Sequence, residues 1–345
     1  MVDELFYAKI REYGTWSLKI EYNQIEEGET MEQVRKVSEA LKHNIGSVIK
    51  GKEDKIEKII IALLCEGHIL LEDLPGTGKT TIAKALSKSL DCNFKRIQFT
   101  PDLLPTDLMG VNFYNQKQGD FIFREGPIFT NILLADEINR ATPRTQSSLL
   151  ECMEETQVSI DGVTYPLEQP FLVIATQNPI ETQGTFPLPE AQLDRFFMKL
   201  GMGYPEKEDE INILTHQRTQ NPLEALERVV TKEELRAAQL AVKEVKVSEP
   251  IKEYIVNISR ATRRFDKIKI GLSLRGSLAM MKAAQAVAAM AGRDFVIPDD
   301  VKYIIYEVAM HRIICKHYNV ISNEQTSKAI LQEIMEQVVV PKEEV

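Results

Sequence analysis

The sequence predicts an α/β domain with a parallel sheet, followed by an all-α domain. Short apolar runs alternate with helical patterns over the first two hundred or so residues, which is typical of buried parallel strands joined by helical crossovers. Beyond the segment Gly201–Pro205 the patterns are helical only. A glycine-rich turn between the first apolar run and the next helix also favours this class.

Four apolar runs are the expected strands of the sheet. They are Ile69–Leu71, Ile97–Phe99, Ile132–Leu134 and Phe171–Ile174. Each run is separated from the next by roughly 30 to 40 residues, enough for a crossover helix. Parallel strands buried on both faces read as such short apolar runs.

The second half of the chain contains the helices of the all-α domain. We expect helices over Glu206–Arg218, Lys232–Val242, Glu249–Arg264, Leu274–Ala291 and Pro298–Lys316. Thr231 with Glu234 forms a capping box, and Ser248 stands before Glu249-Pro250 as a helix start.

Residues 1–30 differ from the rest, because they hold five aromatic side chains without a helical stripe. Met31 then opens an amphipathic pattern that continues through Val34, Val37, Leu41, Ile45 and Val48. We therefore divide the chain into an extension (1–30), an α/β domain (31–203) and a helical domain (204–345). The extension is either an appendage or the product of a misassigned start at Met1.

The composition is that of a soluble globular chain, with 43% hydrophobic and 27% charged residues and a mean hydropathy of −0.20. No run approaches the roughly 18 apolar residues that a membrane span needs. The first residues lack the apolar core of a signal peptide, so we expect a cytoplasmic protein. The four cysteines are far apart and not at metal-ligand spacing, which disfavours zinc and disulfides.

The charge balance weighs against nucleic acid as a partner. Forty-two basic and fifty-one acidic side chains give a net charge of −9, whereas binding to a phosphate backbone needs a basic surface. One basic cluster could still bind nucleic acid, and it consists of Arg260, Arg263, Arg264, Lys267 and Lys269. In an acidic chain we favour a solvated or inter-subunit face for this cluster.

The segment Asp73–Thr80 has the sequence of a P-loop. Glycines let backbone N–H groups close around phosphate oxygens, Lys79 reaches the β- and γ-phosphates, and the Thr80 hydroxyl binds Mg²⁺. The first glycine of the pattern is replaced by Asp73, which tolerates a left-handed turn. The predicted nucleotide contacts are Asp73, Pro75, Gly76, Thr77, Gly78, Lys79, Thr80 and Thr81.

Asp136 and Glu137 follow the apolar run Ile132–Leu134, at the strand end where ligands of parallel sheets bind. An Asp-Glu pair after a strand is often a helix cap. Near a P-loop strand, Asp136 can instead hold the Mg²⁺ shell while Glu137 activates the attacking water. We favour this hydrolytic interpretation.

Three polar positions further along complete the candidate site. Asn178 follows the strand Phe171–Ile174 and can position the water, with Gln177 as the alternative. Arg195 stands in an Asp-Arg pair that is otherwise an ordinary surface salt bridge. Arg275 begins the helix Leu274–Ala291, where it could report the γ-phosphate to a lid or be a solvated helix-end charge.

Five blocks together resemble the AAA+ ATPases, and specifically the MoxR family. They are Leu74–Thr80, Leu133–Arg140, Ile174–Pro179, Phe186–Phe196 and Gly271–Arg275. The resemblance implies that Asn178 is sensor 1, that Arg195 is a finger reaching a neighbour's nucleotide, and that Arg275 is sensor 2. The last block usually reads Gly-Ala-Ser-Pro-Arg in the family and differs here, although its arginine is present.

Two hairpins belong to the same resemblance. The first runs through Val158–Ile160, Asp161-Gly162 and Val163–Tyr165, and a looser one joins Val111–Tyr114 to Phe121–Phe123. In AAA+ proteins similar hairpins, the pre-sensor-1 hairpin and the helix-2 insert, face the centre or the rim of a ring. They are expected to move a partner, or alternatively to cover a sheet edge.

The expected function is Mg²⁺-dependent ATP hydrolysis in an oligomeric ring, with a hexamer as the expected size. The resemblance implies chaperone-like remodelling or maturation of a client protein, with a von Willebrand factor A-type domain in the partner. The alternatives are a nucleic-acid motor or a chelatase-like subunit of the same clade, and a nucleotide-gated scaffold with little turnover. Glu137 and Arg195 argue against the scaffold.

Overall fold

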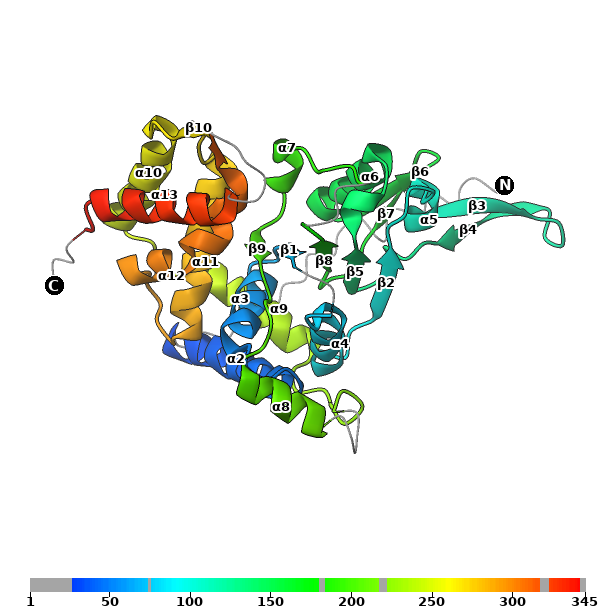
Figure 1. Ribbon diagram of the computed structural model, residues 1–345. Coiled ribbons are helices and arrows are strands. Elements are labelled where there is room, and N and C mark those ends of the chain that lie inside the picture. The colour runs from blue at the N-terminus through cyan, green and yellow to red at the C-terminus, as the bar shows by residue number, and fades with distance from the viewer. Residues whose placement is uncertain (1–26, 74–75, 180–183, 217–221, 317–322, 342–345) are drawn as a thin grey trace, which may run out of the picture.

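A five-stranded parallel sheet lies at the centre of the computed structural model, which describes residues 27–73, 76–179, 184–216, 222–316 and 323–341 (Figure 1). The strand order is β2-β5-β8-β1-β9. The bounds are β1 (Ile69–Glu72), β2 (Phe94–Gln98), β5 (Ile132–Asp136), β8 (Leu172–Gln177) and β9 (Met198–Leu200). All four pairings are parallel, which confirms the predicted sheet and adds β9 as an edge strand.

Side chains alternate between two cores, one on each face of the sheet. Ile69 and Leu71 face the larger core with α2 (Glu27–Val48), α3 (Glu53–Leu64) and α4 (Lys79–Ser89), whereas Leu70 faces the smaller core. The smaller core contains α6 (Pro143–Glu155), and α5 (Pro105–Met109) lies beside it. This period of two is the reason for the short apolar runs in the sequence.

The amphipathic pattern that opens at Met31 forms α2. Its apolar side chains are buried, with Val34, Leu41 and Ile45 completely inaccessible to solvent, as predicted. The helix packs against α3, α4, α9 (Lys232–Lys243) and α11 (Leu274–Met290). Helix α2 begins at Glu27, and residues 1–26 of the expected extension lie outside the described residues.

The helical lid packs beside the edge strand β9 (Figure 1). It contains α10 (Glu249–Arg264), α11 (Leu274–Met290), α12 (Pro298–Ala309) and α13 (Asn323–Gln337), and α8 (Lys207–His216) precedes it. The predicted capping box at Thr231 is present, because its hydroxyl accepts from Glu234 N while the Glu234 carboxylate accepts from Thr231 N. Ser248 is an N-cap residue without a side-chain cap bond.

One predicted lid helix ends earlier than its pattern suggests. We expected a helix over Pro298–Lys316, but α12 ends at Ala309 and is followed by the 3₁₀ turn η2 (Met310–Arg312). The chain then forms β11 (Ile314–Cys315), which pairs antiparallel with β10 (Ile268–Ile270). These strands are too short to leave an alternating pattern, so the prediction of helices alone missed them.

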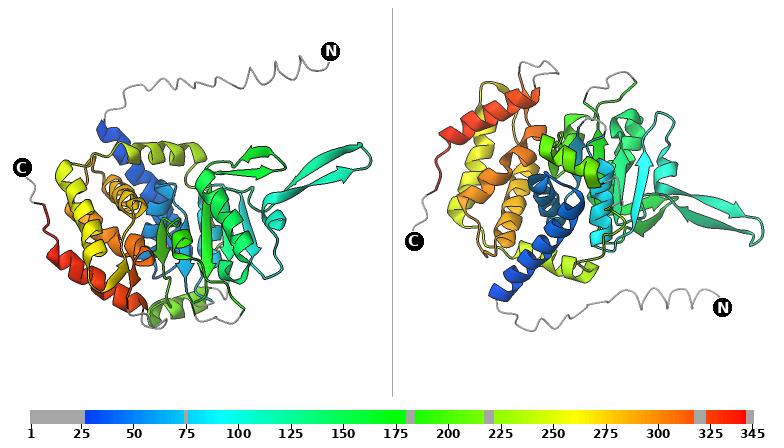
Figure 2. Two further views of the ribbon diagram at one scale, coloured as in Figure 1. Left: turned by 90° about the horizontal axis from the view of Figure 1, so that it is seen from above. Right: turned by 60° about the horizontal axis from the view of Figure 1, so that its bottom comes forward.

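Both predicted hairpins are present, and they contact each other. The first pairs β3 (Gly110–Asn115) with β4 (Asp120–Glu125), and the second pairs β6 (Gln157–Ile160) with β7 (Val163–Pro166). The Phe123 and Tyr165 rings stack with centroids 4.4 Å apart, and Asn112 donates to Asp161 at 2.7 Å. The β3–β4 hairpin projects from the molecule on the side away from the lid (Figures 1 and 2).

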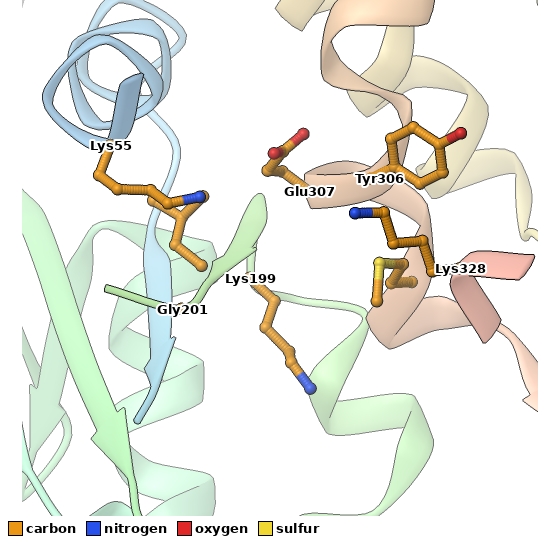
Figure 3. Close-up of a pocket in the computed structure, with 8 residues that line it drawn as sticks. Lys55, Lys199, Gly201, Tyr306, Glu307 and Lys328 are labelled. Carbon is orange, nitrogen blue, oxygen red and sulfur yellow. The ribbon is translucent and has the colours of Figure 1, made fainter. Parts of the chain in front are cut away.

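A pocket of about 320 Å³ separates β9 from the lid (Figure 3). Its walls come from α3, β9, α12 and α13, and they include Lys55, Lys199, Glu307 and Lys328. Beside it, Lys58 of α3 is buried against the Tyr303 ring and Glu307. The lid is therefore joined to the α/β domain by ionic and aromatic contacts as well as by apolar packing.

His68 ties three elements together at the start of β1. Its Nδ1 accepts from Val173 N at 3.0 Å, so Nε2 carries the proton and donates to Met153 O at 2.9 Å. Burial lowers the pKa of His68 to about 4, and the imidazole is therefore neutral in the folded protein.

Replacing His68 by glutamine is expected to change how stability depends on pH. Below pH 6.5 the unfolded chain binds a proton at His68, whereas folded His68 does not bind one until about pH 4. As the pH falls through this window, wild type therefore loses about 1.4 kcal/mol of unfolding free energy per pH unit. The stability difference between wild type and His68→Gln should shrink at that rate from pH 6.5 to 4.5 in urea titrations. A pH-independent difference would contradict the neutral tautomer.

Candidate nucleotide site

The P-loop connects β1 to α4 at the carboxyl edge of the sheet. Gly76 and Gly78 have φ of 84° and 89°, so the left-handed turns of the loop fall on glycines. Lys79 is the first residue of α4, and its Nζ donates to the carbonyl of Asp73 at 2.9 Å. This contact holds the ammonium at the loop, beside the N-terminus of a helix, which favours an anion.

The remaining predicted nucleotide contacts lie in the same loop or in the first turn of α4. Thr77, Thr80 and Thr81 are half-buried, and Pro75 lies outside the described residues. Asp73 is not one of the described residues with positive φ, so the left-handed conformation that aspartate tolerates is not used at this position. Its Oδ2 instead accepts from Gly203 N at 2.7 Å, which ties the P-loop to the segment after β9.

Asp136 is the last residue of β5, and one strand, β8, separates β5 from the P-loop strand β1. One of its carboxylate oxygens accepts from Thr176 Oγ1 at 2.5 Å, and the other pairs with Arg96 at 2.6 Å. Parallel pairing of β5 with β8 brings Asp136 and Thr176 to the same sheet edge. The predicted metal ligand is therefore held by one neutral donor and one cation.

Glu137 adopts an uncommon backbone conformation directly after the strand. Its φ is 56°, in the left-handed region that costs free energy for a residue with a side chain. Its N–H donates to Thr176 Oγ1 at 2.9 Å, and its carboxylate accepts from Gln98 at 2.6 Å and pairs with Arg140 at 2.8 Å. These partners fix both the backbone and the carboxylate.

Asn178 follows β8, the strand between β1 and β5. It therefore lies at the same carboxyl edge as the P-loop and Asp136. Gln177, the alternative, donates to Glu72 at 3.3 Å and so binds the end of the P-loop strand. Both amides lie at the edge where we expect the nucleotide.

The two predicted arginines lie at the opposite edge of the sheet. Arg195 precedes β9, whose Met198 pairs in register with Ile69 at the start of β1. Arg195 pairs with Glu154 at 3.2 Å, and Arg275 pairs with the same carboxylate at 2.5 Å. Glu154 lies in the last turn of α6 next to Met153, which contacts His68 at the amino end of β1. The structure thus brings these arginines together but separates them from Lys79.

Sequence reasoning missed the side chains that hold the two carboxylates. Arg96 and Gln98 lie two residues apart on β2, so they point to the same face, and β2 pairs with β5. Thr176 is buried within a strand that looked purely apolar. The polar alternation in Phe94–Gln98 is the signal that could have identified the first two.

The oxygen atoms of Asp136 and Thr80 suit a Mg²⁺ ion whose other ligands come mainly from the substrate. Asp136 offers a carboxylate and Thr80 a hydroxyl, both oxygen donors of the kind that Mg²⁺ takes. Among the described residues there is no group of three or more acidic, histidine or cysteine side chains that could hold a metal alone. Mg²⁺ in nucleotide sites is usually held by one or two protein ligands together with phosphates and waters.

The fold and the site define the class of the protein: an ATPase with a P-loop and a helical lid. Residues 68–198 match the model of the ATPase family associated with various cellular activities (AAA), and residues 260–334 match an AAA lid domain. The chain belongs to the MoxR family of AAA+ ATPases. No described helix is long and apolar enough to cross a membrane.

Relatives cover nearly the whole chain. The protein named YeaC of Bacillus subtilis is 50% identical over 88% of this chain and 95% of its own length. Chaperone MoxR1 of Mycobacterium tuberculosis is 39% identical over 86% of this chain and 80% of its own. A crystal structure of a candidate ATPase from Cytophaga hutchinsonii aligns with a TM-score of 0.83 at 38% identity, covering 91% and 98% of the two chains.

Replacing Thr176 by valine is expected to slow ATP turnover with little effect on nucleotide binding. The change removes the acceptor of Glu137 N and the donor to Asp136, at a cost of about 1–3 kcal/mol for the buried group left unpaired. If that cost falls on the transition state, kcat drops about tenfold to a hundredfold. ATP affinity should stay within about threefold, because Thr176 binds the carboxylates and not the P-loop.

The matched control is Thr130→Val, which removes another buried hydroxyl that donates to Asn93 O. Steady-state ATPase assays and nucleotide titrations of both variants make the comparison. An unchanged kcat in Thr176→Val would show that its two hydrogen bonds do not hold the carboxylates for hydrolysis.

Proposed function

We propose that the protein hydrolyses ATP with Mg²⁺ between neighbouring subunits of a ring and uses the energy to remodel a partner protein. One observation supports this proposal above the others. Lys79, Asp136 and Glu137 lie at the carboxyl edge of the sheet, whereas Arg195 and Arg275 lie at its amino edge. The two halves of an ATPase site are present in one chain but face away from each other.

At the carboxyl edge the proposed roles follow from chemistry. The N–H groups of the P-loop and the Lys79 ammonium bind the β- and γ-phosphates, and Asn178 orients the attacking water. Glu137 accepts a proton from that water. When bound to Thr80 and Asp136, Mg²⁺ supplies positive charge that neutralises the phosphates.

Both carboxylates have protein partners in the described structure. Arg96 pairs with Asp136, while Gln98 and Arg140 hold Glu137. Arg96 would have to release Asp136 for that carboxylate to hold Mg²⁺. Gln98 and Arg140 both contact Oε2 of Glu137, so a water could meet the other carboxylate oxygen or replace one of these partners. We therefore propose that nucleotide binding rearranges these contacts before hydrolysis.

We propose that Arg195 and Arg275, at the amino edge, meet a neighbouring subunit. A strand advances about 3.3 Å per residue. The two steps from Ile69 to Leu71 therefore separate the amino edge of the sheet from its carboxyl edge by a distance several ångströms longer than a hydrogen bond. A head-to-tail contact repeated around a closed ring puts one subunit's amino edge on the next subunit's P-loop. We propose such a ring, with six subunits as in the family it resembles, in the cytoplasm.

The proposed client surface is the pair of hairpins. Phe113, Tyr114 and Phe121 on the β3–β4 hairpin are 44%, 55% and 67% exposed, which is a large apolar surface on a projecting element. The name of the relative Chaperone MoxR1 is consistent with a protein client. A partner with a von Willebrand factor A-type domain is the expectation that the family resemblance provides.

Lys79→Ala and Glu137→Gln should separate binding from hydrolysis. Lys79→Ala removes the cation that faces the phosphates, so both ATP affinity and turnover should be lost. Glu137→Gln changes the base and leaves the P-loop intact, so it should bind ATP and hardly hydrolyse it. Calorimetry with Mg²⁺ and an ATPase assay measure the two effects. Equal loss of ATP affinity in both variants would show that Glu137 is not the base.

Mixing Arg195→Ala with Lys79→Ala should restore part of the ATPase activity. An arginine finger contributes on the order of 10³–10⁵ in rate, so each variant alone is nearly inactive. In a mixed ring some interfaces join an intact P-loop to an intact Arg195, and only those are active. Mixed assembly is verified by mass, and each variant is also mixed with wild type.

If ATPase activity does not recover in verified mixed rings, Arg195 does not act across the interface. This conclusion requires that mixtures of each variant with wild type lose activity only in proportion to dilution. This control is needed because strict coordination around a ring would also suppress recovery.

A further inference from the structure

A buried arginine of the lid holds the segment that carries Arg195. Arg312 is the last residue of η2, and only 2% of its side chain is exposed. Its guanidinium donates to Asp194 Oδ1 at 2.7 Å and to three backbone carbonyls of this segment: those of Asp194 at 3.2 Å, Phe196 at 2.6 Å and Phe197 at 3.1 Å. These three residues lie on both sides of Arg195 in the sequence.

Two further lid residues bind the same segment. His311, the neighbour of Arg312, contacts Phe196 O through Nε2 at 3.0 Å. Ser273, the N-cap of α11, donates to Asp194 Oδ2 at 3.0 Å. The segment before β9 is therefore attached to the lid through η2 and through the start of α11.

The ionic contacts join a buried arginine to two exposed ones. Arg312 contacts Asp194 inside the protein, and Arg195 and Arg275 share Glu154, whose side chain is 37% exposed. Arg275 also reaches Asp194 Oδ2 at 3.7 Å. Three guanidinium groups face two carboxylates, so the cluster has one positive charge in excess. The buried pair is shielded from solvent, while the two accessible arginines can exchange Glu154 for another anion.

We propose that Arg312 is a positioning residue for hydrolysis in the neighbouring subunit. It fixes the segment Asp194–Phe197 to the lid, and so it holds Arg195 where the finger meets the next subunit's γ-phosphate. This inference rests on the proposed role of Arg195 across the interface. It adds that a movement of the lid in one subunit displaces the finger serving the next subunit.

Arg312→Lys tests the inference, because lysine keeps the charge but loses the planar fork that reaches several acceptors at once. We expect kcat to fall about 10- to 100-fold, as for a displacement of about 1 Å of a catalytic group. The KM for ATP should change less than about threefold, since the variant's own P-loop is intact. The matched control is Arg293→Lys, which alters a bidentate pair with Asp300 inside the lid and should keep wild-type activity.

The decisive measurement mixes Arg312→Lys with Lys79→Ala. If Arg312 serves the neighbour's site, the intact finger of a Lys79→Ala subunit restores hydrolysis at the intact P-loop of an Arg312→Lys subunit. Recovery should approach that of the reference mixture of Arg195→Ala with Lys79→Ala. If Arg312→Lys does not fold by circular dichroism, Asp194→Asn removes the same ion pair and takes its place in the mixture.

The outcomes separate this inference from the function on which it rests. The positioning role alone is overturned if activity recovers in the reference mixture but not in the Arg312→Lys mixture. It is also overturned if folded Arg312→Lys has the kcat of wild type. No recovery in either verified mixture overturns the action of Arg195 across the interface, and the positioning role with it. Recovery in both mixtures supports both.

Discussion

All strands of the central sheet run in one direction, and this constraint determines where the candidate residues of the α/β domain lie. Residues that follow strands, such as Asp136 and Asn178, gather at the carboxyl edge with the P-loop, whereas Arg195 precedes a strand and lies at the amino edge. On our proposal, the sheet itself makes one chain an incomplete ATPase and makes association part of the reaction.

The carboxyl edge has a second property, because its two carboxylates are engaged and one of them sits on a strained backbone. Glu137 is left-handed and is held by Thr176, Gln98 and Arg140. Such strain persists only where surrounding contacts stabilise it, and it is frequent at functional sites. Exchange of these partners on nucleotide binding would link turnover to occupancy, just as the Arg312–Asp194 pair would link the lid to the neighbour's site.

Much of the fold could be predicted from sequence, because apolar runs, helix caps and a glycine-rich loop are local signals. The sheet, both hairpins and the capping box at Thr231 are present in the structure. Contacts between distant segments leave no such signal: Thr176 meets Asp136, and Arg312 meets Asp194, 118 residues earlier. The strands β10 and β11 also left no signal, because two or three residues are too few to show an alternating pattern.

The most direct test of the central claim measures ATPase activity per subunit during dilution, with the assembly state followed by mass photometry in the same buffer. If each site is completed by a neighbour, activity per subunit should fall in proportion to the fraction of chains left in assemblies, and the monomer should bind ATP without hydrolysing it. A monomeric population that hydrolyses ATP at the rate of the assembled protein would contradict the account.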